Sequence, residues 1–323
     1  MQNGQMLRLS VAICACLVST GVTAQPAYPN RLVTVVIPLA PGGVGETEGR
    51  IHLAKLTENL GQQFVLDFKP GGGTIIGMAH VARAVPDGYT LLMVSSSYSL
   101  VPLMSKPLPF DPIKSFEPVS LISKRYSLMM VHPSMPSDLR EFVAYAKANS
   151  DKVNFGSGNL GGIQHLTGAW FATLTGINMT YVHYKGAGPI IPDILAGRIQ
   201  MTPMTLTVGM PHIKSGKLKA LGLANLERNP AFPDIPTLAE GGLKDFEYSS
   251  WGGLLAPAKT SPAIISQLSA EVGKAVRSQE VVKRLGLETQ LMGTSPDQFR
   301  QHIATEVERW RKLVKELGIV LEE

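Results

Sequence analysis

The sequence predicts an α/β protein of two lobes, each a mostly parallel sheet flanked by helices. Apolar runs rich in branched residues alternate with helical patterns, which is typical of parallel sheets. Glycine or proline marks most junctions between them. About 299 of the 323 residues follow a predicted leader, more than one hydrophobic core usually serves.

The first elements follow one another in a regular order. A buried strand over 32–39 is followed by the turn Pro41-Gly42-Gly43-Val44-Gly45 and a helix over 46–60 that Gly61 ends. The elements predicted next are a strand over 64–68, a helix over 73–85 and a strand over 89–95.

The same order then repeats. The predicted elements are a helix capped by Ser137 or Asp138 and ending at 149, a strand over 152–156, a helix over 161–174, a strand over 179–184, a helix over 189–197 and strands over 199–204 and 218–224. Segments 229–236 and 251–257 are expected to return the chain to the first lobe. Two amphipathic helices begin at Ser261-Pro262 and Ser295-Pro296, and their apolar stripes are interpreted as core.

The resulting division places 25–124 and 227–323 in the first lobe and 125–226 in the second. The chain has to cross between the lobes near 122–127 and 222–256, so a hinge is expected there.

The N-terminus predicts export. Arg8 precedes an apolar run and a small-residue stretch ending at Ala24, the pattern of a secretory signal peptide over 1–24 that is cleaved before Gln25. The run is shorter than the roughly 18 apolar residues of a membrane-spanning helix. We therefore expect a periplasmic protein, with lipid attachment at Cys16 as the minor alternative.

Composition excludes several functions. Cys14 and Cys16 both lie in the leader, so the mature chain lacks disulfides and thiolate chemistry. Without Arg8, 29 basic residues face 25 acidic ones, a mild surplus of 4 with no basic tract for nucleic acid. The seven histidines show no paired metal-ligand spacing, and no metal or cofactor is expected.

Two glycine-rich turns are the informative features. Each follows a strand and opens a helix, where free backbone N–H groups and the helix dipole favour an anion. One turn alone more often only redirects the chain. One from each lobe could hold a carboxylate across a cleft. His165, one turn into the second helix, and Lys185, after a strand end, are further candidates.

The sequence gives weaker support for an enzyme than for a binding protein. The second turn spells Gly156-Ser157-Gly158-Asn159-Leu160-Gly161, a formal dinucleotide fingerprint, but no acid follows at the end of the next strand. There is no phosphate-binding loop and no nucleophile elbow. We therefore expect a binding protein and not an enzyme.

Several motifs resemble, in order along the mature chain, the tripartite tricarboxylate transporter receptor family, also called Bug-type extracytoplasmic solute receptors. They are 38–43, Lys69-Pro70-Gly71-Gly72-Gly73, Pro86-Asp87-Gly88-Tyr89-Thr90-Leu91-Leu92, Tyr184-Lys185-Gly186-Ala187-Gly188-Pro189, 211–218, Pro233-Asp234-Ile235-Pro236-Thr237 and Trp251-Gly252-Gly253-Leu254-Leu255-Ala256-Pro257.

The resemblance implies a two-lobed, periplasmic-binding-protein-like clamshell. Such a receptor, expected to be monomeric, closes on a di- or tricarboxylate, an amino acid or an aromatic acid and delivers it to a membrane permease. It also implies that the carboxylate is held between the two strand-turn-helix motifs, partly through water. The implied ligand-binding residues are Pro41, Gly42, Gly43, Val44, Gly45, Glu46, Ser95, Ser96, Gly158, Asn159, Leu160, Gly161, Gly162, His165, Tyr184, Lys185 and Thr205.

The chain departs from the family pattern at four positions. Glu46 replaces an aspartate, Val44 and Gly162 replace small hydroxyl residues, and Gln200 replaces an acid. Glu46 at a helix start would favour the helix dipole, whereas aimed into the cleft it would repel a carboxylate or attract an amine. A receptor of the same fold that feeds a sensor, and an exported enzyme, remain the alternatives.

Overall fold

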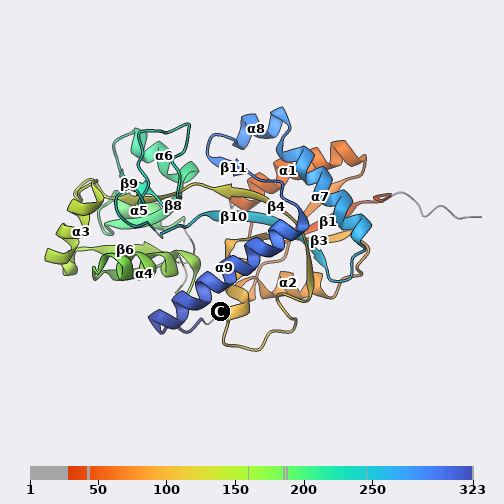
Figure 1. The fold of residues 1–323 in the computed structure, drawn as a ribbon, viewed down its shortest axis with the longest axis horizontal. Helices are drawn as coiled ribbons and strands as arrows, with labels where there is room; N and C mark the ends of the chain where they lie inside the picture. The colour runs from red at the N-terminus through yellow and green to blue at the C-terminus, as the bar shows by residue number, and fades with distance from the viewer. Residues whose placement is uncertain are drawn as a thin grey trace, which may run out of the picture.

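The polypeptide forms two mixed sheets flanked by helices in a computed structural model that describes residues 28–41, 44–158, 160–184, 186, 188–244 and 246–321. Figure 1 shows two lobes side by side. The predicted signal peptide over 1–24 lies outside the described residues.

The first lobe contains a six-stranded sheet of order β11-β4-β10-β3-β1-β2. Its strands are β1 Val33–Ile37, β2 Phe64–Phe68, β3 Thr90–Ser95, β4 Phe116–Arg125, β10 Ser250–Pro257 and β11 Thr289–Leu291. β1 pairs in parallel with β2 and β3, while β10 runs antiparallel between β3 and β4. The strands followed by glycine-rich turns, β1 and β2, both belong to the parallel part of the sheet.

Helices cover both faces of this sheet because its strands alternate buried apolar side chains. The helices of this lobe are α1 Val44–Leu60, α2 Ile75–Ala82, α7 Pro262–Val276, α8 Gln279–Leu285 and α9 Pro296–Leu317, with 3-10 turns over Gly72–Thr74 and Ser96–Leu103. Val33 and Val35 pack with α1 and α7, whereas Val36 packs with α2 and α9. The lobe thus has three layers.

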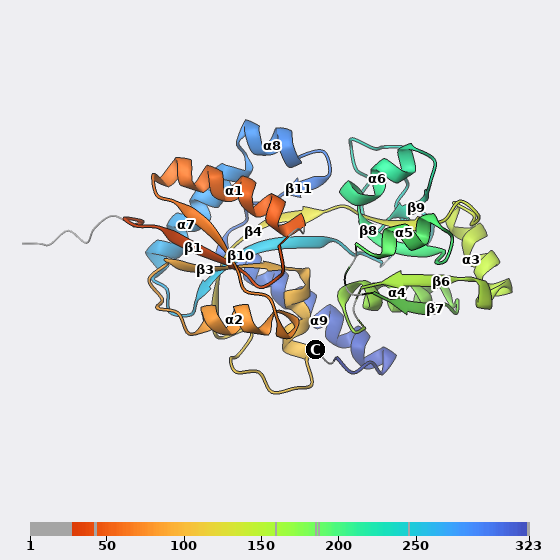
Figure 2. The ribbon, with the colours of Figure 1, turned by 180° about the vertical axis from the view of Figure 1, so that it is seen from behind.

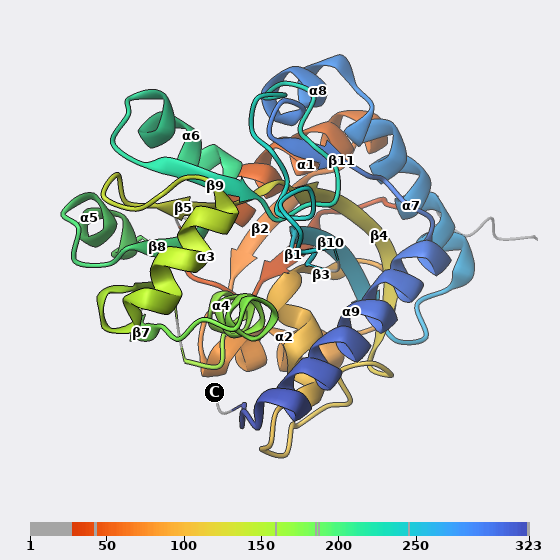
Figure 3. The ribbon, with the colours of Figure 1, turned by 60° about the vertical axis from the view of Figure 1, so that its left-hand side comes forward.

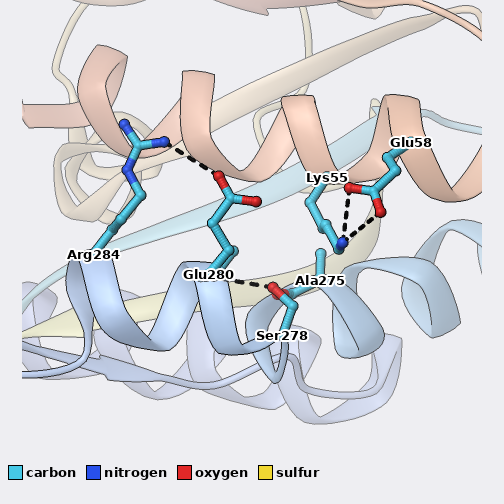
Figure 4. Close-up of polar contacts among 7 residues, drawn as sticks. Lys55, Glu58, Ala275, Ser278, Glu280 and Arg284 are labelled. Carbon is cyan, nitrogen blue, oxygen red and sulfur yellow. Dashed lines mark hydrogen bonds and ion pairs between the residues drawn. The ribbon is translucent and has the colours of Figure 1, made fainter.

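Ion pairs lie on the surface of the lobe on the side of α1 and α8. Lys55 pairs with Glu58 on α1 at 2.7 Å, and Glu280 lies one turn from Arg284 on α8, 3.5 Å apart (Figure 4). Exposed pairs of this kind contribute at most about 1 kcal/mol each. The packed apolar layers beneath them hold these helices in place.

The second lobe contains a five-stranded sheet of order β7-β6-β8-β5-β9. Its elements are β5 Ser127–Val131, α3 Leu139–Ala148, a 3-10 turn Ser150–Lys152, β6 Asn154–Ser157, α4 Ile163–Thr175, β7 Thr180–His183, α5 Ile190–Leu195, β8 Met201–Thr205, α6 Leu206–Lys214 and β9 Lys219–Leu223. α3 and α4 cover one face and α5 and α6 the other (Figure 3).

Three segments join the lobes. β4 and β5 are separated only by Tyr126, and β10 begins after segment 224–249, which packs against the second lobe through Leu238 and Phe246. α9 crosses from one lobe to the other: Phe299 lies in the first core and Trp310 in the second. Figures 1 and 2, which view the molecule from opposite sides, both show α9 running past the two lobes.

Most predicted elements are confirmed within a few residues. The predicted helix over 73–85 is shorter, because Gly73 and Thr74 have positive φ and the α-helix begins at Ile75. The sequence reasoning missed β4, β5, β11, α6 and α8, and it interpreted β10 as a connection. Pro118 in β4 and Gly252-Gly253 in β10 weaken the strand pattern. Gly253 is required there, since a Cβ would lie 2.2 Å from the Phe299 ring.

Candidate ligand-binding site

The first glycine-rich turn connects β1 to α1. The helix begins at Val44, and no side chain adjoins Gly45 where a Cβ would project. Glu46, in the first turn of α1, pairs with Arg50 one turn along at 2.7 Å. Its carboxylate therefore has a partner on its own helix.

The second turn connects β6 to α4, and side chains from the helix brace it. Gly162 is the N-cap and supplies no side-chain cap. Gln164 Oε1 accepts from the Gly158 N–H at 2.9 Å, and His165 Nδ1 accepts from the Gly161 N–H at 3.1 Å. Gly161 has φ +72°, which favours glycine. An uncapped helix start held in this way suits an anion.

The second turn and the residues that precede the first turn line the same part of the cleft between the lobes. A cavity of about 280 Å³, here the rim cavity, is lined by Leu39 and Ala40 before the first turn and by Leu160, Gly161 and Gly162 of the second. That the two turns face each other across the cleft stays a prediction. Both turns follow the carboxyl ends of parallel strands, where ligands bind in open α/β sheets.

Deeper in the cleft lies the interlobe cavity of about 330 Å³. It is lined by side chains and backbone from both lobes, among them Ser95, Ser96, Gly158, Gly162, Ser127 and Thr205. The hydroxyls of Ser127 and Thr205, which face each other across the β5–β8 pair, are buried without a hydrogen-bond partner in the described part of the chain. Buried polar atoms without partners are uncommon, and a ligand would satisfy these two.

Behind the first turn lies the first-lobe cavity of about 210 Å³, which adjoins the interlobe cavity at Ser95, Thr205 and Ser250. Much of its wall is apolar, from Ile37, Met93 and Ile122 among others. The first-lobe cavity is thus a mostly apolar extension of the same cleft.

Two charged side chains line the first-lobe cavity, and they form a buried ion pair. Arg125 Nε donates to Glu48 Oε1 at 2.6 Å and its Nη2 donates to Oε2, while Nη1 donates to Ser250 at 3.2 Å. Ser123 Oγ donates to Glu48 Oε2 at 2.9 Å. Both charged side chains are only 5% exposed. The pair is bidentate, the strongest arrangement for arginine and a carboxylate.

His52 completes this wall from α1. Its ring is 2% exposed, and neither ring nitrogen has a hydrogen-bond partner among the described residues. Burial lowers its pKa to about 4, with Glu48 opposing and Arg125 adding to the shift. The ring is therefore neutral near pH 7 and presents one donor and one acceptor.

The structure brings together about half of the predicted ligand-binding residues. Those lining the three cavities are Gly45, Ser95, Ser96, Gly158, Leu160, Gly161, Gly162 and Thr205. Pro41, Glu46, His165 and Tyr184 do not line them. Gly42, Gly43, Asn159, Lys185 and the side chain of Val44 lie outside the described part of the chain.

Besides Glu46, two more of the predicted residues have other partners. His165 braces the Gly161 N–H and packs edge-on against His183, with ring centroids 4.8 Å apart. Tyr184 donates to Asp193 at 2.6 Å. Gln200 accepts from the Asn154 N–H at 2.9 Å inside the second lobe. Ligand contact by His165 and Tyr184 stays a prediction.

Sequence reasoning missed the charged wall. Gly45, Glu48, Gly49 and His52 recur at helical spacing on α1, the spacing of a core-facing stripe. Small and polar residues occupy that stripe instead of apolar ones. This departure is the signal that could have identified the cavity, whereas Arg125 and Ser250 are distant in sequence and carry no local pattern.

The described residues hold no group of three or more His, Cys, Asp or Glu side chains that could bind a metal ion. Among those residues, no helix is long and apolar enough to cross a membrane. Among the described residues, the polar groups that line the three cavities are backbone groups, hydroxyls, the Gln164 amide, the His52 imidazole and the closed Glu48–Arg125 pair. Such a set binds and orients a small molecule.

Two α/β lobes around a cleft are the architecture of periplasmic solute-binding receptors. Residues 50–319 match the model of the tripartite tricarboxylate transporter family receptor. The chain belongs to this family, whose fold is that of substrate-binding receptors and not of enzymes. Members of the family are periplasmic receptors.

Individual proteins agree with this assignment. Protein BugT of Bordetella pertussis is 33% identical over 98% of this chain and 99% of its own. The periplasmic binding protein BugD is 30% identical with a TM-score of 0.78, covering 91% of this chain and 99% of its own. The R. palustris protein Rpa4515, solved with adipate, is 30% identical with a TM-score of 0.81 over the same shares.

Proposed function

We propose that the protein captures a small carboxylate between its two glycine-rich turns and delivers it to the membrane subunits of a tripartite tricarboxylate transporter. The observation that carries the proposal is the rim cavity, where Gly161 and Gly162 at the start of α4 line the same space as Leu39 and Ala40, which precede the first turn. Helix N-termini present N–H donors and partial positive charge to an anion. A structural neighbour solved with the dicarboxylate adipate supports the same ligand chemistry.

The second support is the set of free hydroxyls below the turns. Ser127 and Thr205 have donors without partners in the part of the chain that the structure describes. A hydrogen bond to a charged group contributes about 1.5 to 3 kcal/mol, more than one between neutral groups. These hydroxyls would therefore add to the binding of a carboxylate held at the turns.

Capture in such a cleft requires the lobes to move. The hinge that we propose includes Tyr126 between β4 and β5 and the connection leading into β10. We further propose that residues 1–24 direct export and are removed, and that the mature receptor is a monomer. Small-angle scattering profiles that coincide with and without saturating ligand would contradict closure.

A thermal-shift screen of mono-, di- and tricarboxylates, amino acids and their neutral amides tests the ligand class. Binding at 100 times the dissociation constant stabilises the folded state by about 2.7 kcal/mol, which raises the melting temperature measurably. We expect at least one carboxylate to shift the melt while its amide does not. A screen in which only neutral compounds shift it would refute the proposal.

A further inference from the structure

The first-lobe cavity has a composition that a carboxylate site alone does not explain. It lies behind Gly45 and continues the cleft inward, so a ligand anchored at the turns would extend into it. Its volume of about 210 Å³ can be compared with a cavity of about 150 Å³ that accommodates benzene. The space therefore suits the body of a small ligand, either a ring or a short chain.

Arg125 is the cationic side chain on this wall, and it already forms an ion pair with Glu48. The guanidinium donates from Nε and Nη2 to the two carboxylate oxygens of Glu48, and Nη1 donates to Ser250. The carboxylate in turn accepts from Ser123. Glu48 thus holds the place that a second carboxylate of a ligand would take on an arginine.

Among the described residues of this wall, a second ligand charge would find no unpaired counter-ion. To take over the bidentate pair with Arg125 it would have to displace Glu48, and breaking a buried pair leaves an uncompensated charge. Carrying a charge into a buried wall without a partner is strongly unfavourable. The closed pair therefore selects against a ligand whose far end is ionised.

His52 provides the polar recognition that remains. Its ring is 2% exposed, lines the same cavity and has two nitrogens without partners among the described residues. A neutral imidazole can donate to and accept from an uncharged hydroxyl or carbonyl group. This is an observation independent of the ion pair, and it points to a ligand group at that wall.

We infer that the first-lobe cavity takes the uncharged body of a monocarboxylate, and that Glu48 and His52 together favour a neutral polar group over a second carboxylate. This substrate class rests on the proposed function, since the ligand's single carboxylate is the group held at the turns. It also sets the chain apart from its neighbour solved with adipate, a dicarboxylate.

Calorimetry on the mature protein with hexanoate and adipate tests the inference, because the two differ only in the second carboxylate. We expect hexanoate to bind at least tenfold more tightly. Adipate binding as tightly as hexanoate, or more tightly, would overturn the inference while leaving carboxylate capture intact. Failure of both acids and of every carboxylate in the thermal screen would instead refute the proposed function, and this inference with it.

Variants test the two wall residues separately. Glu48→Gln frees the charge of Arg125, so the preference for hexanoate over adipate should fall at least tenfold. Glu58→Gln is the control, because Glu58 lies on the same helix but pairs with Lys55 at the surface (Figure 4). An unchanged preference in folded Glu48→Gln protein would overturn the role of Glu48. Melting temperatures establish that each variant folds.

For His52 the probes are phenylacetate and 4-hydroxyphenylacetate. The added hydroxyl should tighten binding three- to tenfold in the parent protein, and this gain should vanish in His52→Phe. A hydroxyl that adds no affinity in the parent, or that adds the same affinity in the variant, would overturn the assignment of His52.

Discussion

The two halves of the cleft obtain their polarity in different ways. On the second-lobe side, the donors are the helix start at Gly162 and the hydroxyls of Ser127 and Thr205, which have no partners within the described chain. On the first-lobe side, the charges of Arg125 and Glu48 satisfy each other. The second-lobe half therefore keeps side-chain donors open to an anion, whereas the first-lobe wall behind the turn has closed its side-chain charges and offers volume.

We expect the second-lobe half to determine the affinity for a carboxylate and the first-lobe wall to determine the selectivity between ligands. Groups without partners in the free protein gain most when a ligand arrives, since no internal bond has to break. A closed ion pair gains nothing from a ligand charge and excludes the wrong one. The following predictions test this division by changing one half at a time.

The largest effect is expected from Arg125→Met. Removing one partner of a buried pair leaves Glu48 uncompensated and should lower the free energy of unfolding by about 3 to 5 kcal/mol. The double variant Arg125→Met/Glu48→Leu should recover most of that loss. Urea denaturation of the ligand-free proteins measures both. A single variant as stable as the parent would mean that the pair does not close the first-lobe wall.

The next effect is expected from Gly162→Asp in the open half. A fixed carboxylate at the start of α4 competes for the N–H groups that the ligand needs. Like charges about 4 Å apart repel by about 4 kcal/mol at an effective dielectric near 20, which weakens binding several hundredfold. Stability should not fall, because aspartate is favoured at N-caps and Gly162 has an ordinary φ of −71°.

Gly162→Asn is the matched control for that variant, because asparagine has nearly the same shape without the charge. Calorimetry with a carboxylate from the screen should show a large loss for aspartate and a much smaller one for asparagine. Parental affinity in Gly162→Asp would place the carboxylate elsewhere.

A smaller loss is expected from Thr205→Val. The hydroxyl has no hydrogen-bond partner among the residues that the structure describes, so its removal should leave the free energy of unfolding unchanged. Binding should weaken by about 1.5 to 3 kcal/mol, the contribution of a hydrogen bond to a charged group. Thr202→Val on the same strand is the control: its hydroxyl donates to the Gly156 carbonyl at 2.9 Å, so stability should fall while affinity is kept.

The last effect, the smallest per pH unit, concerns the pH dependence of stability. Burial lowers the pKa of His52 to about 4, below the value near 6.5 of an unfolded chain. The unfolded state therefore takes up this proton first, and stability falls as pH drops from about 6.5 to 4, by up to about 1.4 kcal/mol per pH unit. His52→Phe should remove that contribution. Equal slopes in the parent and the variant, measured by denaturation at several pH values, would contradict the buried neutral ring.

The sequence predicted the two sheets and the two glycine-rich turns because these features are local. Strand and helix periodicity, glycine at positive φ and helix caps such as Ser261 and Ser295 act over a few residues. The same locality explains why half of the implied site residues do line the cleft.

The first-lobe wall could not be predicted in this way. Glu48 and His52 come from one helix, but Ser123 and Arg125, the partners of Glu48, come from a strand more than 70 residues away. Ser250, which accepts from Arg125, comes from β10. Strand β10, with its adjacent glycines, lacks the pattern that would place it in the centre of a sheet. Long-range strand pairing brings these groups together.

The most direct measurement of the central claim compares one carboxylate from the screen with its primary amide by calorimetry on the mature protein. The amide has nearly the same shape but no charge to satisfy the donors of the open half. Losing two charge-assisted hydrogen bonds at about 1.5 to 3 kcal/mol each should weaken binding at least a hundredfold. Equal affinities for the acid and the amide would contradict the account, because the turns would then not be holding a carboxylate.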